Sequence, residues 1–504
     1  MALSRNLLVG VLNSAWVAVT GLIVVPFYLK YLGIDAYGLI GFFLTLQALF
    51  QLLDMGLAPT INREVARCSV SGNMHEARNL LHSLAVIYFA MAIGIATMVF
   101  FLAPFIAQYW LQSENISQHA MTMAIKLMGL VIACRWPIGL YQGALMGAQR
   151  LIISSSINIV MVTLGSLGSI SILAFVSPTI EAFFIWQACV GLIYICTIRR
   201  EAWKVIGKEA KSKFDIAGLK RIWRFSVGMS AVALSGLVFT QLDKVLLSKM
   251  LALSEFGHYM LATTVVSALY LLVIPFFNVI YPRFSALVEK GSTEELIKLY
   301  RVGTRLMASI LFPIAMLLFL FAQDFVFVWT GDHSVSLSVG PLISILAIGS
   351  ALHGVMYFPY ALQLSYGMSR LPLIINCILM VIMIPLIIIL VPSYGALGGA
   401  VTWLVLHVLY LMLGTWITHR HLLKGTGGEW LVKDVGIPLI LTALLSFLGY
   451  FVLEIAEYSP SPYIRLVLGL GLALSAFSIS VALSSQLRFI VISKFEWTKK
   501  VSIN

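Results

Sequence analysis

The chain has 504 residues, of which 60% are apolar and only 11% charged, and its mean hydropathy is +0.97. A soluble globular protein could not cover its surface with polar groups at this composition, so we predict an all-α, polytopic membrane protein. The net charge of +12 would suggest nucleic-acid binding in a soluble protein. Here the basic residues lie between apolar segments, as in loops that face anionic lipid, which excludes nucleic acid as a partner.

Apolar segments recur from one end of the chain to the other. A helix that crosses a bilayer needs about 20 mainly apolar residues. The first segment is too long for the apolar region of a signal peptide, and no small-residue cleavage site follows it. We therefore predict about fourteen spans, near residues 7–28, 37–60, 81–107, 122–147, 151–175, 179–198, 223–248, 256–281, 303–328, 341–364, 371–391, 397–418, 435–454 and 463–486.

The distribution of positive charge supports this count and orients the chain. With the N-terminus in the cytoplasm, 27 of the 33 Lys and Arg residues fall in inner loops and tails. Only Lys30, Lys249 and Arg465 lie on the outer side of the membrane, and Lys126, Arg135 and Lys244 lie within predicted spans. Cytoplasmic loops carry an excess of basic residues, and removing one span would reverse every later loop. We therefore predict an even number of spans with both termini in the cytoplasm.

An internal repeat divides the chain. Residues 30–38 (KYLGIDAYG) align with residues 249–257 (KMLALSEFG), and this alignment matches Gly38 to Gly257. Six predicted spans separate the two copies, so both run in the same direction, and the two halves can rock against each other in alternating access. We predict two pseudo-symmetric six-helix lobes followed by two further helices: an N-lobe (1–198), a basic cytoplasmic linker (199–222), a C-lobe (223–418), and the last two helices with a cytoplasmic tail (419–504).

Polar side chains recur at helical spacing in the first two spans of each lobe. Inside hydrocarbon such side chains face protein or water rather than lipid. Many of them simply hydrogen-bond a neighbouring helix, and that alternative stays open for each stripe. The candidates for lining a wet cavity are Asn13, Gln47, Gln51, Asp54, Lys244 and Asn278.

Arg135 lies in the middle of the fourth predicted span. An arginine at that depth costs roughly 2.5 to 3.5 kcal/mol on insertion scales, so we expect it to line a wet cavity. A structural ion pair or a side chain that reaches the interface is the alternative. Asp243 and Lys244 are about 100° apart around a helix, and we do not expect them to face each other.

Two other features bear on function. His353, Tyr357 and Tyr360 share one helix face, which suits stacking on a sugar, although buried aromatic packing explains it equally simply. No P-loop, HExxH, GxSxG or paired acidic motif occurs, and the outer loops are too short to hold a catalytic domain. We therefore predict a protein that is not an enzyme and that needs no cofactor or metal.

The stretch 25–67 contains a YLG-x-x-x-YG turn, an LLD-x-G-L run and an NRE-x-AR exit. In these elements it resembles the bacterial polysaccharide transporters. These are the O-antigen (Wzx-type) flippases of the multidrug/oligosaccharidyl-lipid/polysaccharide exporter superfamily. The resemblance implies a MATE-like fold and a flippase that moves undecaprenyl-diphosphate-linked oligosaccharides to the outer leaflet of the bacterial inner membrane. That family has no strict catalytic motif, so the resemblance assigns no site residue.

For such a cargo we expect basic groups to attract the diphosphate and polar groups to contact sugar hydroxyls. The expected diphosphate ligands are Arg135, Arg63, Arg283 and Arg305, and the expected sugar contacts are Gln47, Gln51, Asn13 and Asn278. The expected partners are membrane lipid and polysaccharide polymerase or assembly proteins. Whether H⁺ or Na⁺ is coupled to transport stays open.

Two other functions compete with this interpretation. The first is a cation-coupled multidrug exporter of the same superfamily, for which Asp54 and Asp243 are the acidic candidates. The second is a membrane-embedded glycosyltransferase or polymerase, which the short outer loops and the lack of paired carboxylates disfavour.

Overall fold

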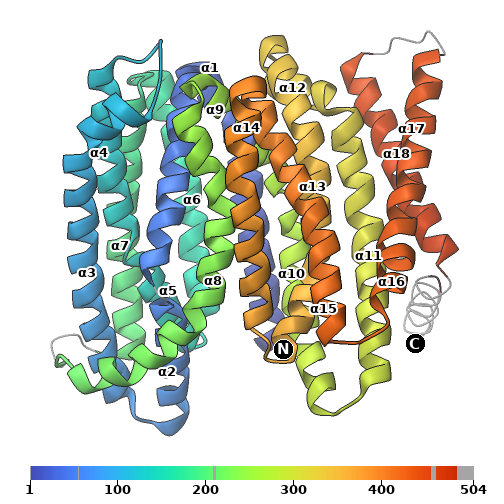
Figure 1. The fold of residues 1–504 in the computed structure, drawn as a ribbon. Helices are drawn as coiled ribbons and strands as arrows, with labels where there is room; N and C mark the ends of the chain where they lie inside the picture. The colour runs from blue at the N-terminus through green and yellow to red at the C-terminus, as the bar shows by residue number, and fades with distance from the viewer. Residues whose placement is uncertain (1, 55, 208–211, 456–460, 485–487, 489–504) are drawn as a thin grey trace, which may run out of the picture. The chain divides into compact units, whose positions relative to one another are not determined.

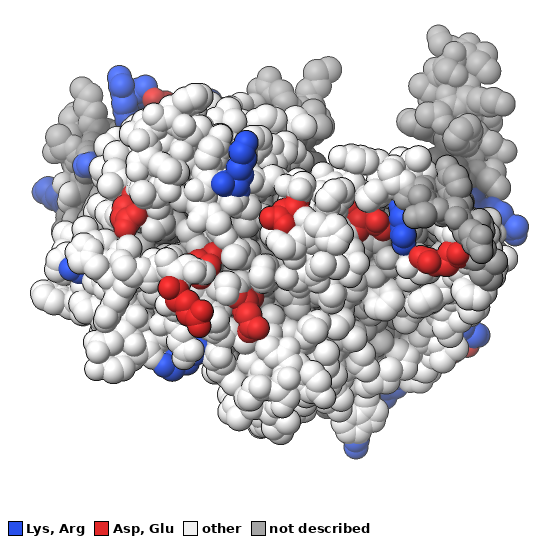
Figure 2. Space-filling model, turned by 90° about the horizontal axis from the view of Figure 1, so that it is seen from above, with Lys and Arg blue, Asp and Glu red and all other residues white. Residues whose placement is uncertain are grey.

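The computed structural model describes residues 2–54, 56–207, 212–455, 461–484 and 488. These residues are almost entirely helical, and no β-strand occurs among them (Figure 1). Eleven helices in this part of the chain are long and apolar enough to cross a membrane. Figure 2 shows one face of the molecule, on which most side chains are uncharged. The prediction of an all-α, multi-pass membrane protein is confirmed.

Two of these helices are interrupted by a glycine with a non-helical backbone conformation. Helix α1 (Ala2–Gln51) contains Gly33 with φ 79°, and α14 (Arg370–Leu409) contains Gly395 with φ 55°. Glycine adopts these backbone angles without the steric cost that a Cβ would bring, and each glycine divides its helix into two helical pieces. The predicted total of about fourteen spans stays a prediction.

The chain forms two compact units, residues 1–257 and residues 258–504. The division falls within α9 (Leu253–Ser267). Residues 208–211 of the predicted linker lie outside the described residues, and the predicted lobe boundaries stay predictions. The other elements of the first unit are η1 (Leu52–Asp54), α2 (Leu57–Ser71), α3 (Met74–Phe105), the π-helical η2 (Ile106–Trp110), α4 (Gln118–Arg135), α5 (Ile138–Gly147), α6 (Leu151–Phe175), α7 (Ile180–Ile206) and α8 (Ile216–Met250).

The second unit is built around α13 (His333–Ser365), which packs against α10, α11, α12 and α14. Helix α11 also packs against α17 and α18. The elements besides α13 and α14 are α10 (Tyr270–Glu289), α11 (Thr293–Leu320), α12 (Ala322–Thr330), the π-helical η4 (Tyr410–Gly414), α15 (Thr415–His421), α16 (Gly427–Glu429), the π-helical η5 (Trp430–Gly436), α17 (Ile437–Ile455) and α18 (Pro462–Leu483).

Short sequence signals set several helix ends. The Ser117 side chain accepts a hydrogen bond from the Ala120 N–H at the start of α4, at 3.2 Å. Asp215 accepts one from the Gly218 N–H at the start of α8, at 2.8 Å. These are N-caps, which satisfy N–H groups that have no partner within the helix. Pro137 has no N–H to continue a helix, and it separates α4 from α5 directly after Arg135 and Trp136.

One hydrophobic core of the first unit holds α2, α3, α5, α7 and the start of α8 together. Ile61, Leu80, Tyr141, Ile198 and Ile222 are buried in it, one from each helix. Ile222 belongs to the predicted basic linker, so the end of that linker is anchored by apolar packing.

The start of α9 packs closely on α1 at the two glycines that the repeat matches. A Cβ on Gly38 would lie 2.4 Å from the carbonyl oxygen of Leu253, and one on Gly257 would lie 2.5 Å from that of Ile34. The Leu253 N–H also donates to the Gln112 carbonyl at 2.7 Å. Small residues let helix backbones approach at such distances, and any larger side chain would separate them.

Candidate functional site

Arg135 lies within the apolar segment 118–147, at the C-terminal end of α4. Its guanidinium donates a hydrogen bond to Oε1 of Gln187 in α7 and lies 5.8 Å from the centroid of the Phe43 ring. Gln187 is buried, and its Nε2 donates to Oγ of Ser169 in α6 at 2.9 Å. We call Arg135, Gln187 and Ser169 the Arg135 cluster. None of the ion pairs between described residues involves Arg135.

The surroundings of Arg135 stabilise its charge without neutralising it. An amide oxygen accepts one of the five guanidinium N–H donors but carries no net charge. The end of α4 adds the partial negative charge of the last helix carbonyls, which favours a cation there. A guanidinium with donors to spare suits bidentate binding of a phosphate. The alternative of a structural ion pair with a carboxylate finds no support among the described residues.

A second polar cluster joins four helices. Gln142 Nε2 in α5 donates to the Tyr194 hydroxyl in α7 at 2.7 Å, and that hydroxyl donates to Asn158 Oδ1 in α6 at 3.0 Å. Asn158 Nδ2 then donates to Oδ1 of Asn13 in α1 at 2.8 Å. We call these four residues the Asn158 cluster. The predicted site residue Asn13 therefore faces neighbouring helices.

One stripe on α7 carries residues of both clusters. The stripe consists of residues at i, i+4 and i+7, namely Gln187, Gly191 and Tyr194. Gln187 and Gly191 face α4, since a Cβ on Gly191 would lie 3.5 Å from Cγ of Arg135, and Tyr194 faces α5 through its hydrogen bond with Gln142. Seven residues along a helix span about 10 Å, which is the separation of the two clusters along α7. Sequence reasoning missed Gln187, Tyr194 and Asn158, although the helical spacing of Gln187 and Tyr194 in α7 was a visible signal.

The predicted polar residues of the second span, Gln47, Gln51 and Asp54, differ in their burial and in their hydrogen-bond partners. Asp54 accepts hydrogen bonds from the Tyr88 hydroxyl in α3 and, at 3.4 Å, from the Ala58 N–H in the first turn of α2. Gln47 is partly buried, and its Oε1 has no hydrogen-bond partner among the described residues. Gln51 is exposed.

Lys244 corrects one prediction. Its Nζ lies 3.1 Å from Oδ1 of Asp243 and also donates to the Thr240 carbonyl at 2.8 Å, and both members of the pair are buried. The prediction that the two side chains do not face each other is wrong. The angular argument describes where the Cβ atoms point, whereas a four-carbon lysine stem can bend back across the helix surface.

The predicted site residues of the second unit have different environments. Arg305 Nε donates to Oδ1 of Asp434 at 3.1 Å, and Arg301 Nε donates to Oδ2 of the same carboxylate at 2.8 Å. The Asp434 side chain is fully buried, so two arginines balance one buried negative charge. Asn278 and Arg283 are exposed on α10.

The aromatic stripe of α13 is a packing feature. His353 Nδ1 lies 2.6 Å from the Tyr270 hydroxyl, and the Tyr360 ring stacks on Phe277 with centroids 5.6 Å apart. Tyr357 contacts both Tyr270 and Phe277. Of the two explanations for this stripe, buried aromatic packing agrees with the structure.

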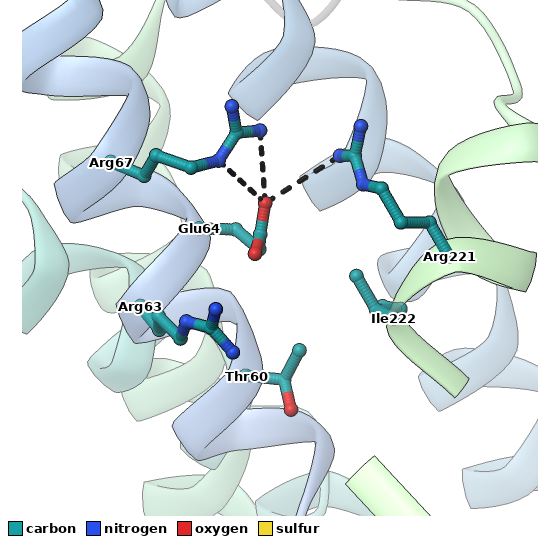
Figure 3. Close-up of a pocket in the computed structure, with 6 residues that line it drawn as sticks. All are labelled: Thr60, Arg63, Glu64, Arg67, Arg221 and Ile222. Carbon is teal, nitrogen blue, oxygen red and sulfur yellow. Dashed lines mark hydrogen bonds and ion pairs between the residues drawn. The ribbon is translucent and has the colours of Figure 1, made fainter. Parts of the chain in front are cut away.

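A pocket of about 390 Å³ lies where the start of α8 meets α2 (Figure 3). Its lining residues are Thr60, Arg63, Glu64, Arg67, Arg221 and Ile222, and we call it the arginine pocket. The predicted site residue Arg63 is exposed on its wall. Hydrogen bonds to Glu76 and Glu64 raise the pKa of Arg67 above its usual value, which keeps the guanidinium charged.

Comparison with known sequences identifies similar proteins along most of the chain. A family profile described as "Polysaccharide biosynthesis protein" matches residues 3–288, which is more than half of the chain. A curated protein of Shigella flexneri described as "Putative O-antigen transporter" is 22% identical over 422 residues, covering 81% of this chain and 97% of that protein.

Comparison with solved structures shows the fold. Lipid II flippase MurJ in an inward closed conformation matches with a TM-score of 0.67 at 15% identity, over 94% of this chain and 98% of that one. An inward-facing multidrug resistance MATE family transporter of the MOP superfamily also reaches 0.67, at 12% identity, over 80% of this chain and 95% of its own. The predicted MATE-like fold is confirmed.

Proposed function

Because the chain belongs to the polysaccharide biosynthesis protein family, we propose that it is a flippase for lipid-linked oligosaccharides. In this proposal the cargo is an O-antigen-like unit joined through a diphosphate to undecaprenyl. It moves by alternating access from the cytoplasmic to the outer leaflet of the bacterial inner membrane. The similarity to the Shigella flexneri protein described as "Putative O-antigen transporter" and to the MurJ flippase supports a transporter of such a lipid rather than an enzyme.

The observation that carries the proposal is the environment of Arg135. A positive charge in the middle of a membrane span is expensive unless it has a partner, and the partner found here is an uncharged amide. An anionic cargo group would supply the missing charge during transport. A diphosphate suits this role, since its oxygens match the fork of a guanidinium.

The cargo has a polar head group and an apolar chain, and only the head group must be shielded from hydrocarbon. The diphosphate and sugars cannot cross hydrocarbon, whereas the polyprenyl chain can remain in lipid throughout. In the proposal Arg135, Arg63, Arg283 and Arg305 attract the diphosphate. Binding at Arg305 would compete with Asp434, while binding at Arg135 would displace no carboxylate. The polar residues proposed to contact sugar and head group are Asn13, Gln47, Gln51, Asp54, Lys244 and Asn278.

The membrane potential would assist this movement. Transfer of negative charge outward, down an inside-negative potential, yields about 2.3 kcal/mol per charge per 100 mV. Such assistance would reduce the need for H⁺ or Na⁺ coupling.

The test is transport of a fluorescent lipid-linked oligosaccharide by the purified protein in proteoliposomes. Arg135→Ala is expected to lower the initial rate by about tenfold or more, because a hydrogen bond to a charged group contributes about 1.5 to 3 kcal/mol. Lys126→Ala is the matched control, since Lys126 is another basic residue of the same apolar segment and lies over the Phe100 ring. Equal rates for Arg135→Ala and the control would refute the proposal.

A cation-coupled drug exporter is the second candidate, and Asp54 is the observation that favours it. Its carboxylate lies where α1 gives way to α2 and accepts a hydrogen bond from Tyr88. A coupled exporter would lose drug efflux on Asp54→Asn. A flippase would instead show loss of surface polysaccharide and accumulation of single lipid-linked units on the inner leaflet when the gene is deleted. That phenotype also separates a flippase from a polymerase or glycosyltransferase.

A further inference from the structure

Ion pairs at the arginine pocket join its two helices, α2 and α8, to a third, α3. Arg67 Nε in α2 donates to Oε2 of Glu64 at 3.0 Å, and Arg221 Nη2 in α8 reaches the same oxygen at 3.5 Å. Figure 3 shows both guanidinium groups pointing at this carboxylate. Both arginines also donate to Oε1 of Glu76 at the start of α3. Two carboxylates are thus held between two guanidinium groups.

At the arginine pocket the basic side chains outnumber the acidic ones and are more exposed to solvent. The pocket lining carries three basic side chains, Arg63, Arg67 and Arg221, and one acidic side chain, Glu64, while Glu76 pairs with Arg67 and Arg221 beside it. The Glu64 side chain is only 10% exposed, while those of Arg67 and Arg221 are 44% and 52% exposed. The carboxylate therefore lies at the base of the pocket and the guanidinium groups lie at its mouth, within reach of an arriving anion.

A carboxylate at this position has the chemistry of a bound phosphate. Its Oε2 accepts from the guanidinium groups of both Arg67 and Arg221, and guanidinium groups are also the side chains that bind phosphate oxygens. The pocket volume of about 390 Å³ lies in the range of small-ligand sites, roughly 300 to 1,000 Å³. It leaves space beyond Glu64 for a group larger than a carboxylate.

We propose that the arginine pocket is a second anion site, one that binds a phosphate or diphosphate group between Arg67 and Arg221 with Arg63 on its wall. Glu64 occupies the position of one phosphate in this structure, so binding exchanges the Glu64 carboxylate for the ligand. Glu76 Oε1 accepts from both arginines as well, so both guanidinium groups keep one carboxylate partner during the exchange. Glu64 thereby weakens binding and makes release easier.

The phosphate could come from two sources with the same chemistry. One is the head group of an anionic lipid, since residues 199–224 are strongly basic and such runs lie against anionic membrane surfaces. The other is a phosphate carried by a separate ligand, which under the proposed function is the diphosphate of the cargo. The choice of a diphosphate as probe rests on the proposed function; the site itself rests on the pocket.

The experiment is calorimetric titration of inorganic pyrophosphate into the full-length protein in nanodiscs of uncharged lipid. Glu64→Gln is expected to tighten binding by up to about fivefold, because a partly exposed ion pair contributes up to about that factor. Arg67→Gln and Arg221→Gln are expected to weaken binding by about tenfold. Glu295→Gln and Lys298→Gln remove the same charges at exposed positions of α11 and serve as matched controls.

Each outcome decides the proposal. Tighter binding by Glu64→Gln, weaker binding by both arginine variants and unchanged binding by both controls would support it. No heat of binding, or equal effects of Glu64→Gln and Glu295→Gln, would overturn it. If Glu64→Gln lowers the thermal midpoint so far that the protein unfolds, Arg221→Lys keeps the charge but loses the fork, and unchanged binding by that variant would overturn the proposal.

Two further arms separate the sources and the two proposals. Repeating the titration with phosphatidylglycerol in the nanodiscs lowers the pyrophosphate affinity if the site holds a lipid head group. It leaves the affinity unchanged if the site serves a separate phosphate ligand, and either result is consistent with an anion site. Normal transport by Arg135→Ala alongside the predicted pyrophosphate results would refute the proposed function and leave this inference standing.

Discussion

Gln187 determines the electrostatics of the membrane-embedded arginine. Its Oε1 accepts the hydrogen bond of Arg135 while its Nε2 donates to Ser169 and, at 3.4 Å, to the Gly165 carbonyl. The amide therefore orients Arg135 and is itself held by α6. A carboxylate of the same shape would convert this hydrogen bond into an ion pair.

Gln187→Glu keeps the group that orients Arg135 but gives that group a negative charge, so it tests the effect of charge alone. We expect the variant to fold, because Glu and Gln are nearly isosteric and Arg135 gains a charged partner. We expect transport to fall by about tenfold or more, because the carboxylate competes with the diphosphate for Arg135. Transport of the lipid-linked oligosaccharide in proteoliposomes measures the change, and thermal unfolding checks the fold. Transport at the wild-type rate would show that Arg135 does not bind the cargo by charge.

The buried pair Asp243 and Lys244 allows a test of stability. Removing one partner leaves an uncompensated charge, which costs about 3 to 5 kcal/mol, whereas replacing both with apolar residues of similar size is often neutral. We expect Asp243→Leu and Lys244→Met each to lower the thermal midpoint strongly, and the double variant to recover much of the loss. Thermal unfolding of the purified proteins in detergent measures this. A double variant as unstable as the worse single variant would contradict the role of this pair.

At the scale of helices, the contact between α1 and α9 depends on two glycines. Gly38 and Gly257 are matched by the internal repeat, and a Cβ on Gly257 would lie 3.2 Å from the backbone nitrogen of Gly38. The repeat was found from sequence similarity alone. Its structural meaning is that the two copies bring their small residues to the same contact.

Adding a methyl group at this contact should separate the helices. We expect Gly38→Ala and Gly257→Ala each to destabilise the protein by about 1 to 3 kcal/mol, because backbone carbonyl oxygens lie within 2.5 Å of the added Cβ positions. Gly21→Ala in α1 is the matched control, since nothing lies within 4 Å of its Cβ position. Unfolding in detergent measures the difference. Equal stability of all three variants would show that the contact is not close in solution.

At the scale of the whole molecule, the predicted orientation rests on the distribution of basic residues. Single cysteines in a background that lacks the five native ones can test it by labelling intact cells with a membrane-impermeant thiol reagent. We expect Glu114→Cys and Ser461→Cys to react from outside, and Lys298→Cys and Lys424→Cys to react only after the membrane is opened. Labelling of Lys298→Cys but not Lys424→Cys from outside would contradict the four spans predicted between these two positions.

The class of protein could be predicted from the sequence because hydrocarbon imposes strict demands on composition. Long apolar segments must be helices when their backbone groups have no water to bind, so spans and helical content follow from residue counts. Breaks at Gly33 and Pro137 likewise follow from local backbone chemistry. The unusual position of Arg135 was also visible, because its place within an apolar segment is a property of the chain alone.

Which side chains meet was decided only by the tertiary structure. Arg135 and Gln187 are 52 residues apart, and Asn158 and Asn13 are 145 apart, so no local spacing could pair them. The rotation of each helix about its axis is set by packing against its neighbours, and it selects one polar stripe for contact over another. Composition therefore determined that this is a helical membrane protein, while packing determined that the partly buried Arg135 has an amide as partner.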